Sequence, residues 1–431
     1  MINWKEVYRK KVTDAKTAVK NIKSGNRVVI GHAASEPQML VEAMVENYES
    51  YRDVEIVHMV ALGKGKYTAP EMEGHFRHNS LFVGASTRLA VKEGRGDYTP
   101  CFFYEIPRLF KNSYLPVDVV LIQVSVPDEH GYCSYGIACD YTKSATECAK
   151  FVIAEVNPNM PRVLGDNFIH VSDIDCIVES EMNLIELQPP KITEVERNIG
   201  KYCASLIEDG STLQLGIGSI PDAVLMFLKD KKDLGIHSEM FSDGVVDLFN
   251  DGVITNKLKT IHPGKMIVTF LMGTKKLYDF VNNNPLVELY PVDYVNAPTV
   301  ISKNNNMVSI NSCIQVDFMG QVASESIGPV QFSGTGGQVD YVRGASMAKN
   351  GKAIIAMPST ASKGKISRIV PNLDFGTAVT TSRNDVHYIV TEYGIADLRG
   401  KTLKERAKAL ISIAHPKFRD ELTQKFNEIY K

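Results

Sequence analysis

The residue best suited to do chemistry in this chain is a carboxylate, Glu239, in the stretch 235–244 (GIHSEMFSDG). It closes a short apolar run just before a turn built from Ser, Asp and Gly. Most Glu side chains are solvated surface groups, so a lone Glu carries little information. A Glu at a strand-to-loop junction, close to a loop that can offer bare backbone amides, is instead typical of a carboxylate nucleophile beside an oxyanion or phosphate site.

A glycine-rich turn of this kind lies about twenty residues upstream, at 214–221 (QLGIGSIP). It begins like a dinucleotide fingerprint, but Pro221 stands where the third glycine belongs, and this disfavours nicotinamide binding. The pattern predicts that a strand ends, that two glycines let a ligand approach the backbone, and that Pro221 opens a helix. A helix N-terminus favours a phosphate or a developing oxyanion. A tight turn without a ligand is the alternative.

A second glycine cluster lies at 332–341 (FSGTGGQVDY). Gly336 and Gly337 can expose successive amides to a ligand, and the side chain of Gln338 both donates and accepts hydrogen bonds. Further along, Lys363 in 362–365 (SKGK) could supply positive charge for a phosphate tail, or could be an ordinary solvated lysine.

Composition narrows the class of protein. The chain has 431 residues, 44% hydrophobic and 23% charged, with a net charge of -2, so it exerts no general attraction for nucleic acid or anionic membranes. Its N-terminus lacks an apolar signal core, and no stretch approaches the ~20 apolar residues of a membrane span. The seven cysteines are scattered and form no CxxC pair, and His75 and His78 lack further ligands. We therefore expect a cytoplasmic enzyme with reduced thiols and no metal.

Short apolar runs alternate with amphipathic stretches along the whole chain, which predicts α/β architecture with largely parallel sheets flanked by helices. The expected strands are 27–30, 54–57, 117–122, 151–154, 265–269 and 353–356, and helices are expected at 221–228 and across 403–426. The pattern breaks at 187–191 (LQPPK). We therefore predict two domains, 1–188 and 189–431, with the glutamate and the glycine-rich loops in the second.

A faint internal repeat supports this division. Residues 22–32 resemble 207–217 at an offset of 185, and each copy continues into a proline and a helical run. Residues 53–59 then align loosely with 233–239, so that Met59 takes the place of Glu239. The repeat predicts two related α/β halves with chemistry specialised in the second, and chance similarity of two βα units is the alternative.

These segments together resemble, over nearly the whole chain, the acetyl-CoA hydrolase/transferase branch of the family I coenzyme A transferases. The matching motifs are 58–60 (HMV), 213–218 (LQLGIG), 235–240 (GIHSEM), 293–296 (DYVN), 333–340 (SGTGGQVD), 380–385 (TTSRND) and 391–396 (TEYGIA). One departure is that Met240 and Phe241 follow the glutamate, where some branches have a glycine two residues on.

The resemblance implies that Glu239 attacks an acyl-CoA thioester and that CoA moves between a short-chain acyl-CoA and a carboxylic acid through a glutamyl-CoA thioester. It implies 4-hydroxybutyrate as the acid and acetyl-CoA as the donor; butyryl-CoA:acetate transfer, acetyl-CoA hydrolysis with the same glutamate and non-catalytic CoA binding are the alternatives. It also implies CoA as substrate, no permanent cofactor, and a homodimer or homotetramer.

The resemblance further assigns contacts to named residues. Asn296 is expected to orient a substrate carboxylate or the glutamyl group, and His32 and Met59 to wall the acyl pocket, where His32 could reach a 4-hydroxyl group or could simply be packed. The substrate and CoA contacts are expected from Gln214, Leu215, Gly216, Ile217, Gly218, Ser219, Gly336, Gly337, Gln338 and Lys363.

Overall fold

The computed structural model describes residues 3–216 and 218–430. By internal packing the chain forms two compact units: unit 1 comprises Met1–Leu187 and Ile267–Val295, and unit 2 comprises Gln188–Met266 and Asn296–Lys431. The chain first passes from unit 1 to unit 2 within 187–191, where the sequence pattern breaks. The segment Ile267–Val295 packs with unit 1, so the compact units are not two uninterrupted stretches of sequence.

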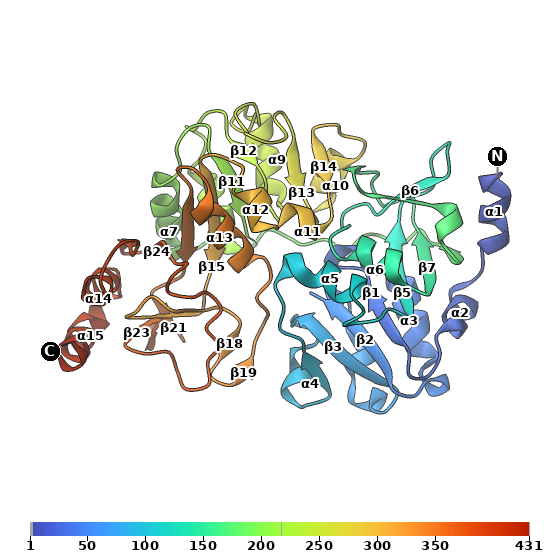
Figure 1. Ribbon diagram of the computed structural model, residues 1–431, viewed down its shortest axis with the longest axis horizontal. Helices are drawn as coiled ribbons and strands as arrows, with labels where there is room; N and C mark the ends of the chain where they lie inside the picture. The colour runs from blue at the N-terminus through green and yellow to red at the C-terminus, as the bar shows by residue number, and fades with distance from the viewer. Residues whose placement is uncertain (1–2, 217, 431) are drawn as a thin grey trace. The chain divides into compact units, whose positions relative to one another are not determined.

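Unit 1 is built on a seven-stranded sheet whose strands are all parallel (Figure 1). In sheet order the strands are β10 (Cys176–Glu179), β7 (Phe151–Val156), β5 (Val119–Val124), β1 (Arg27–Ile30), β2 (Val54–Met59), β3 (Phe76–Phe82) and β4 (Gly96–Tyr98). Every residue of β2 and β5 is buried, as expected when helices cover both faces of a parallel sheet.

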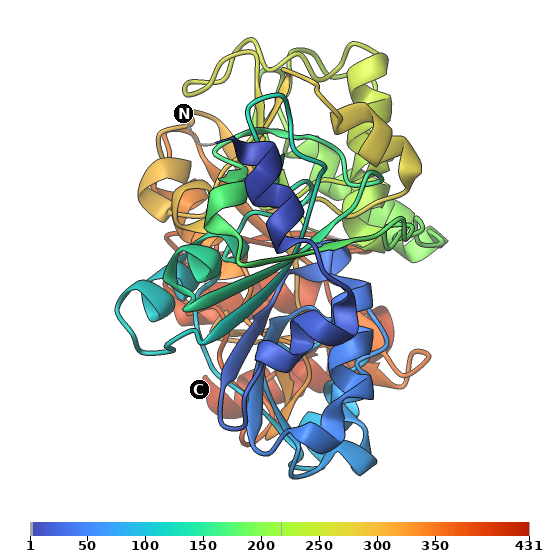
Figure 2. The same cartoon turned by 90° about the vertical axis from the view of Figure 1, so that its right-hand side faces the viewer.

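The helices of unit 1 are α1 (Trp4–Lys11), α2 (Ala15–Ala18), α3 (Gln38–Glu46), α4 (Arg88–Lys92), α5 (Ile106–Lys111), α6 (Thr142–Cys148), α10 (Lys275–Val281) and α11 (Val292–Val295). Figure 2 shows α2 and α3, in blue, beside the strands β1 and β2. Their buried side chains, including Leu40 and Met44, join Val28 and Ile56 in one apolar cluster. Two small sheets complete the unit, β6 (Tyr132–Ser134) with β9 (Phe168–His170), and β13 (Met266–Val268) with β14 (Val287–Leu289) and β8 (Leu164–Gly165).

Unit 2 is built on a six-stranded sheet in which only the edge strand β25 is antiparallel. In sheet order the strands are β12 (Gly235–Ile236), β11 (Thr212–Leu215), β15 (Met307–Ser312), β20 (Lys352–Ala356), β24 (Tyr388–Thr391) and β25 (Gly394–Asp397). The helices are α7 (Glu194–Ser205), α8 (Ser219–Met226), α9 (Asp243–Asn250), α12 (Pro298–Ile301), α13 (Gln338–Met347), α14 (Leu403–Ser412) and α15 (Pro416–Ile429).

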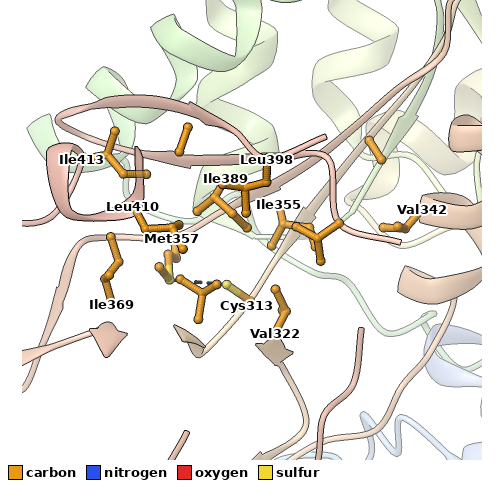
Figure 3. Packing of buried hydrophobic residues seen from close by; sticks show 14 of the residues in the cluster. Cys313, Val322, Val342, Ile355, Met357, Ile369, Ile389, Leu398, Leu410 and Ile413 are labelled. Atoms are coloured by element: carbon orange, nitrogen blue, oxygen red, sulfur yellow. Dashed lines mark hydrogen bonds between the residues drawn. The ribbon is translucent and has the colours of Figure 1, made fainter. Parts of the chain in front are cut away.

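Unit 2 also contains short strands outside its six-stranded sheet. They are β16 (Gln315–Asp317), β17 (Val322–Ala323), β18 (Ser326–Ile327), β19 (Val330–Gln331), β21 (Thr360–Ala361), β22 (Ile366–Ser367) and β23 (Ile369–Val370). Figure 3 shows the core that β16, β17 and β23 share with β20, β24 and α14, where Cys313 lies 3.4 Å from the sulfur of Met357 among buried aliphatic side chains. Burial raises the pKa of the Cys313 thiol to about 12, so this thiol stays protonated and unreactive and contributes only to packing.

The two sheets share one plan. Val28 of β1 pairs with Ile56 of β2, and Leu213 of β11, which is 185 residues after Val28, pairs in parallel with Ile236 of β12. On the other side β1 adjoins β5 as β11 adjoins β15, and each sheet continues with two further parallel strands. The prediction of two related α/β halves with largely parallel sheets is therefore confirmed, and its strand limits were correct to within about two residues, the usual precision of such boundaries.

Candidate active site

Glu239 follows β12 at the carboxyl end of the unit 2 sheet, and its two neighbours are held by one residue of β11. The hydroxyl of Ser238 lies 3.2 Å from the amide and 3.3 Å from the carbonyl oxygen of Leu215, and Met240 forms a backbone bridge with Leu215. In an extended chain, successive side chains point to opposite faces. The side chain of Glu239 therefore points away from those of Ser238 and Met240, which are held by Leu215. Its side chain is partly exposed, as a nucleophile requires.

Asn296 supplies the first polar contact to this carboxylate. Its side-chain Nδ2 donates to Oε2 of Glu239 at 2.9 Å, and the residue is fully buried directly after α11. Among the described residues its Oδ1 has no hydrogen-bond partner. A buried amide oxygen without a partner is unfavourable until a ligand or water donates to it, so Asn296 can hold Glu239 with one atom and receive a donor with the other.

The turn before α13 closes on the same carboxylate. Gly336 has a φ of +54°, and Gly337 is the N-cap residue of α13. A β-carbon built on Gly337 would overlap Oε2 of Glu239 and would lie 2.5 Å from Nδ2 of Asn296. The position therefore requires glycine, and it brings the positive end of a helix against the carboxylate.

Tyr341 is a neighbour of the site that the sequence analysis missed. It lies one helical turn after Gly337, whose carbonyl accepts its amide hydrogen at 3.0 Å, and its side chain is fully buried. Burial first, and then the charges of Glu239 and Asp340, raise its pKa well above the ordinary value, so the phenol stays neutral. The spacing of four residues along α13 was the available signal.

The predicted helix after this glycine-rich segment is present, but it starts at a different residue. Gly218 has a φ of +108° and caps α8, which begins at Ser219 rather than at Pro221. Pro221 still lies in the first turn, where its missing N–H removes no helical hydrogen bond. The amide of Gly216 donates to the carbonyl of Ile310 at 3.2 Å, so that hydrogen is already used within the fold. Ile217 lies outside the described residues.

Three other predicted contact residues of unit 2 are placed as follows. Gln214 is buried on β11, and its amide pairs reciprocally with that of Asn311, at 3.0 and 3.3 Å. Gln338 is the first residue of α13 and is 8% exposed, with its amide also engaged by the protein. Lys363 is exposed between β21 and β22, with a φ of +58°. The structure thus joins Glu239, Asn296 and Gly337 in direct contact.

His32 and Met59 lie in unit 1, at the ends of β1 and β2. His32 is fully buried: its Nδ1 is 2.8 Å from Oδ2 of Asp140, and its ring packs edge-on against Phe103 and Phe270. Among the described residues, Nε2 of His32 has no hydrogen-bond partner. Met59 is 2% exposed.

No group of three or more His, Cys, Asp or Glu side chains suited to a metal ion occurs among the described residues. Within the same residues, no helix is long and apolar enough to cross a membrane.

Known proteins resemble this chain along nearly its whole length. Residues 2–188 match the acetyl-CoA hydrolase/transferase N-terminal domain, and residues 273–426 match the corresponding C-terminal domain. The chain is 67% identical to the 4-hydroxybutyrate coenzyme A transferase of Clostridium kluyveri, over 99% of this chain and 100% of that protein. It is 40% identical to the butyryl-CoA:acetate CoA-transferase of Anaerostipes caccae, over 98% of this chain and 97% of the relative.

Solved structures agree. The 4-hydroxybutyrate CoA-transferase from Porphyromonas gingivalis has a TM-score of 0.87 and 47% identity, covering 99% of this chain and 100% of that one. RipA from Yersinia pestis has a TM-score of 0.94 and 38% identity, with both chains fully covered.

Proposed function

Because the chain belongs to the acetyl-CoA hydrolase/transferase family and is a CoA-transferase, we propose that it moves CoA from acetyl-CoA to 4-hydroxybutyrate through a thioester on Glu239. The observation that carries the proposal is the contact of Glu239 with both Asn296 and Gly337. The choice of 4-hydroxybutyrate is supported by the 67% identity to the enzyme of that name, against 40% for the butyryl-CoA:acetate enzyme.

The first half-reaction begins when a carboxylate oxygen of Glu239 attacks the thioester carbon of acetyl-CoA. The C–S bond breaks, CoA leaves as its thiolate, and an acetyl-glutamyl anhydride remains. The thiolate then attacks the glutamyl carbonyl, releasing acetate and leaving a glutamyl-CoA thioester. In the second half-reaction the carboxylate of 4-hydroxybutyrate attacks this thioester, and the released thiolate attacks the hydroxybutyryl carbon of the new anhydride, which restores Glu239. Charge and atoms balance without any cofactor, and the kinetics are ping-pong.

A carboxylate with an ordinary pKa of about 4 is ionised at neutral pH but is a weak nucleophile. We assign Asn296 the task of fixing the attacking oxygen. Its Oδ1, which has no partner among the residues that the structure describes, is assigned the task of accepting a donor from bound substrate. The N-terminus of α13 at Gly337 is suited to stabilising the negative charge of the tetrahedral intermediates.

The other contact assignments are proposals of the same kind. Amides at 216–219 and Gly336 are assigned to the thioester oxygen or the CoA arm, although the Gly216 amide would first have to leave Ile310. Lys363 is assigned to a CoA phosphate, and its side chain is exposed to solvent. The acyl-pocket roles of Met59 and His32 stay predictions from the family resemblance; a substrate hydroxyl that reached His32 would meet Nε2, because Nδ1 is paired with Asp140. A homodimer or homotetramer stays a prediction, which light scattering during gel filtration would measure.

The test is intact mass after incubation with acetyl-CoA followed by borohydride. Reduction of a glutamyl thioester converts the carboxylate to an alcohol, with a loss of about 14 Da that should map to Glu239 and be absent from Glu239→Ala. CoA exchange without this loss would refute the covalent route. Release of acetate from acetyl-CoA at full rate without an acceptor acid would identify a hydrolase instead, and a larger kcat/KM for butyrate than for 4-hydroxybutyrate would reassign the acid.

A further inference from the structure

The side-chain amide of Gln338 is the meeting point of three separate segments of unit 2. Its Nε2 donates to the carbonyl of Ser312, the last residue of β15, at 2.6 Å. Its Oε1 accepts from the hydroxyl of Ser324 at 2.7 Å and from that of Thr381 at 3.2 Å. Both lone pairs of Oε1 are therefore used within the protein, which leaves this amide oxygen no capacity to accept a hydrogen bond from CoA.

A second set of hydrogen bonds, made by Glu325, holds the loop that leads into the Gly336–Gly337 turn. The backbone carbonyl of Glu325 accepts the amides of Phe332 and Ser333 at 2.7 and 3.0 Å. The carboxylate of the same residue, 7% exposed, accepts from Gln331 at 3.3 Å and, at 3.4 Å, from the hydroxyl of Thr335. The turn is thus held before it by Glu325 and after it by Gln338.

These hydrogen bonds matter because the turn is in close contact with Glu239, without free space between them. Gly337 has no space for a β-carbon beside the carboxylate, so a shift toward Glu239 produces a clash. A shift away withdraws the N-terminus of α13 from the reacting group. A misplacement of about 1 Å at a catalytic contact costs on the order of 100-fold in rate.

We propose that Gln338 is a positioning residue that fixes the Gly336–Gly337 turn against Glu239, rather than a contact to CoA. The inference rests on the proposed role of Glu239 as nucleophile. Gln338 acts through the turn and touches no reacting atom. Its loss therefore lowers kcat and leaves the KM for acetyl-CoA nearly unchanged, whereas loss of a CoA contact would raise that KM.

The test variant is Gln338→Met, which keeps the length of the side chain and removes its hydrogen bonds. The matched control is Gln321→Met, because Gln321 holds another turn of unit 2, donating to Oδ2 of Asp317 at 2.6 Å. We expect Gln338→Met to slow glutamyl-CoA formation at saturating acetyl-CoA by about 10- to 100-fold with KM within about twofold of wild type. Gln321→Met should lower the melting temperature but keep the wild-type kcat.

A raised KM with wild-type kcat would overturn the inference, and so would a lowered melting temperature with kcat and KM both unchanged. If Gln338→Met does not fold, Ser324→Ala and Thr381→Val each remove one donor to Oε1 of Gln338. A fall in kcat smaller than that expected for Gln338→Met supports the inference. An unchanged kcat in both variants overturns it. The proposed function fails separately, if the wild-type enzyme exchanges CoA without a borohydride-sensitive Glu239.

Discussion

Met59 and Glu239 occupy equivalent places in the two halves of the chain. Each stands three residues beyond an isoleucine, Ile56 or Ile236, that pairs in the same register with the first strand of its own sheet. Met59 is buried, whereas Glu239 keeps partial exposure and contacts Asn296. The same arrangement of strands thus occurs in both halves, and the second half carries the carboxylate that we propose as the nucleophile.

We predict that Glu239→Gln abolishes CoA exchange, lowering kcat by about four orders of magnitude or more, because an amide cannot form the anhydride. The neutral side chain still fits beside Asn296, so the melting temperature should change little. The measurement is the steady-state rate of 4-hydroxybutyryl-CoA formation, with Glu208→Gln, an exposed glutamate of unit 2, as the control. Exchange within tenfold of wild type would contradict the assignment.

Gly337→Ala should lower kcat by about 100-fold or more, because its methyl group overlaps the Glu239 carboxylate and displaces it. Gly264→Ala is the control: Gly264 has a φ of +80° and open space around it, so alanine there costs about 1–2 kcal/mol of backbone strain without reaching the site. Equal kinetic losses in the two variants would show that strain, and not contact with Glu239, sets the rate.

Asn296→Asp should change the pH dependence of exchange. It places a second carboxyl group at the 2.9 Å contact, and two like charges that close raise the pKa of one member of the pair. Below that raised pKa the pair shares a proton and Glu239 is a poorer nucleophile, so activity should increase as pH rises. The measurement is kcat from about pH 5 to pH 9, compared with Asn296→Ala, which loses activity without the new dependence. Parallel profiles for the two variants would refute this reading.

Buried Glu36 of unit 1 should make stability fall as pH rises. Burial raises its pKa from 4.5 to about 7; Glu155 adds to the rise, and the amide of Gly63 opposes it. The folded state then binds more protons than the unfolded state between these values, so the stabilisation present below the unfolded pKa is lost as pH rises through the folded one. As pH rises between these two pKa values, the free energy of unfolding of Glu36→Gln should increase relative to that of wild type by up to about 3 kcal/mol.

Denaturant unfolding at about pH 5 and about pH 8 measures this difference, with Glu49→Gln, an exposed glutamate of unit 1, as the control. A gap between Glu36→Gln and wild type that does not change with pH would mean that Glu36 is ionised in the folded protein at both values.

Much of this protein was determined by local sequence. Apolar runs predicted β1 and β20 to within one residue, the offset of 185 residues predicted the shared register of β1–β2 and β11–β12, and the motifs predicted the family. These features are encoded locally because side-chain periodicity reports which face of a strand or helix is buried. Glu239 could be singled out as a candidate for the same reason, as a carboxylate at the end of a short apolar run.

Only the tertiary structure decided which polar groups are already used. Sequence reasoning treated Gln338, the Gly216 amide and His32 alike as candidate ligand contacts, yet the first binds Ser312, the second Ile310 and the third Asp140. These partners lie 26, 94 and 108 residues away, and no local period specifies them. The same holds for the contact of Gly337 with Glu239: a hydrogen bond or a steric limit between distant residues exists only once the packed sheet has brought their elements together.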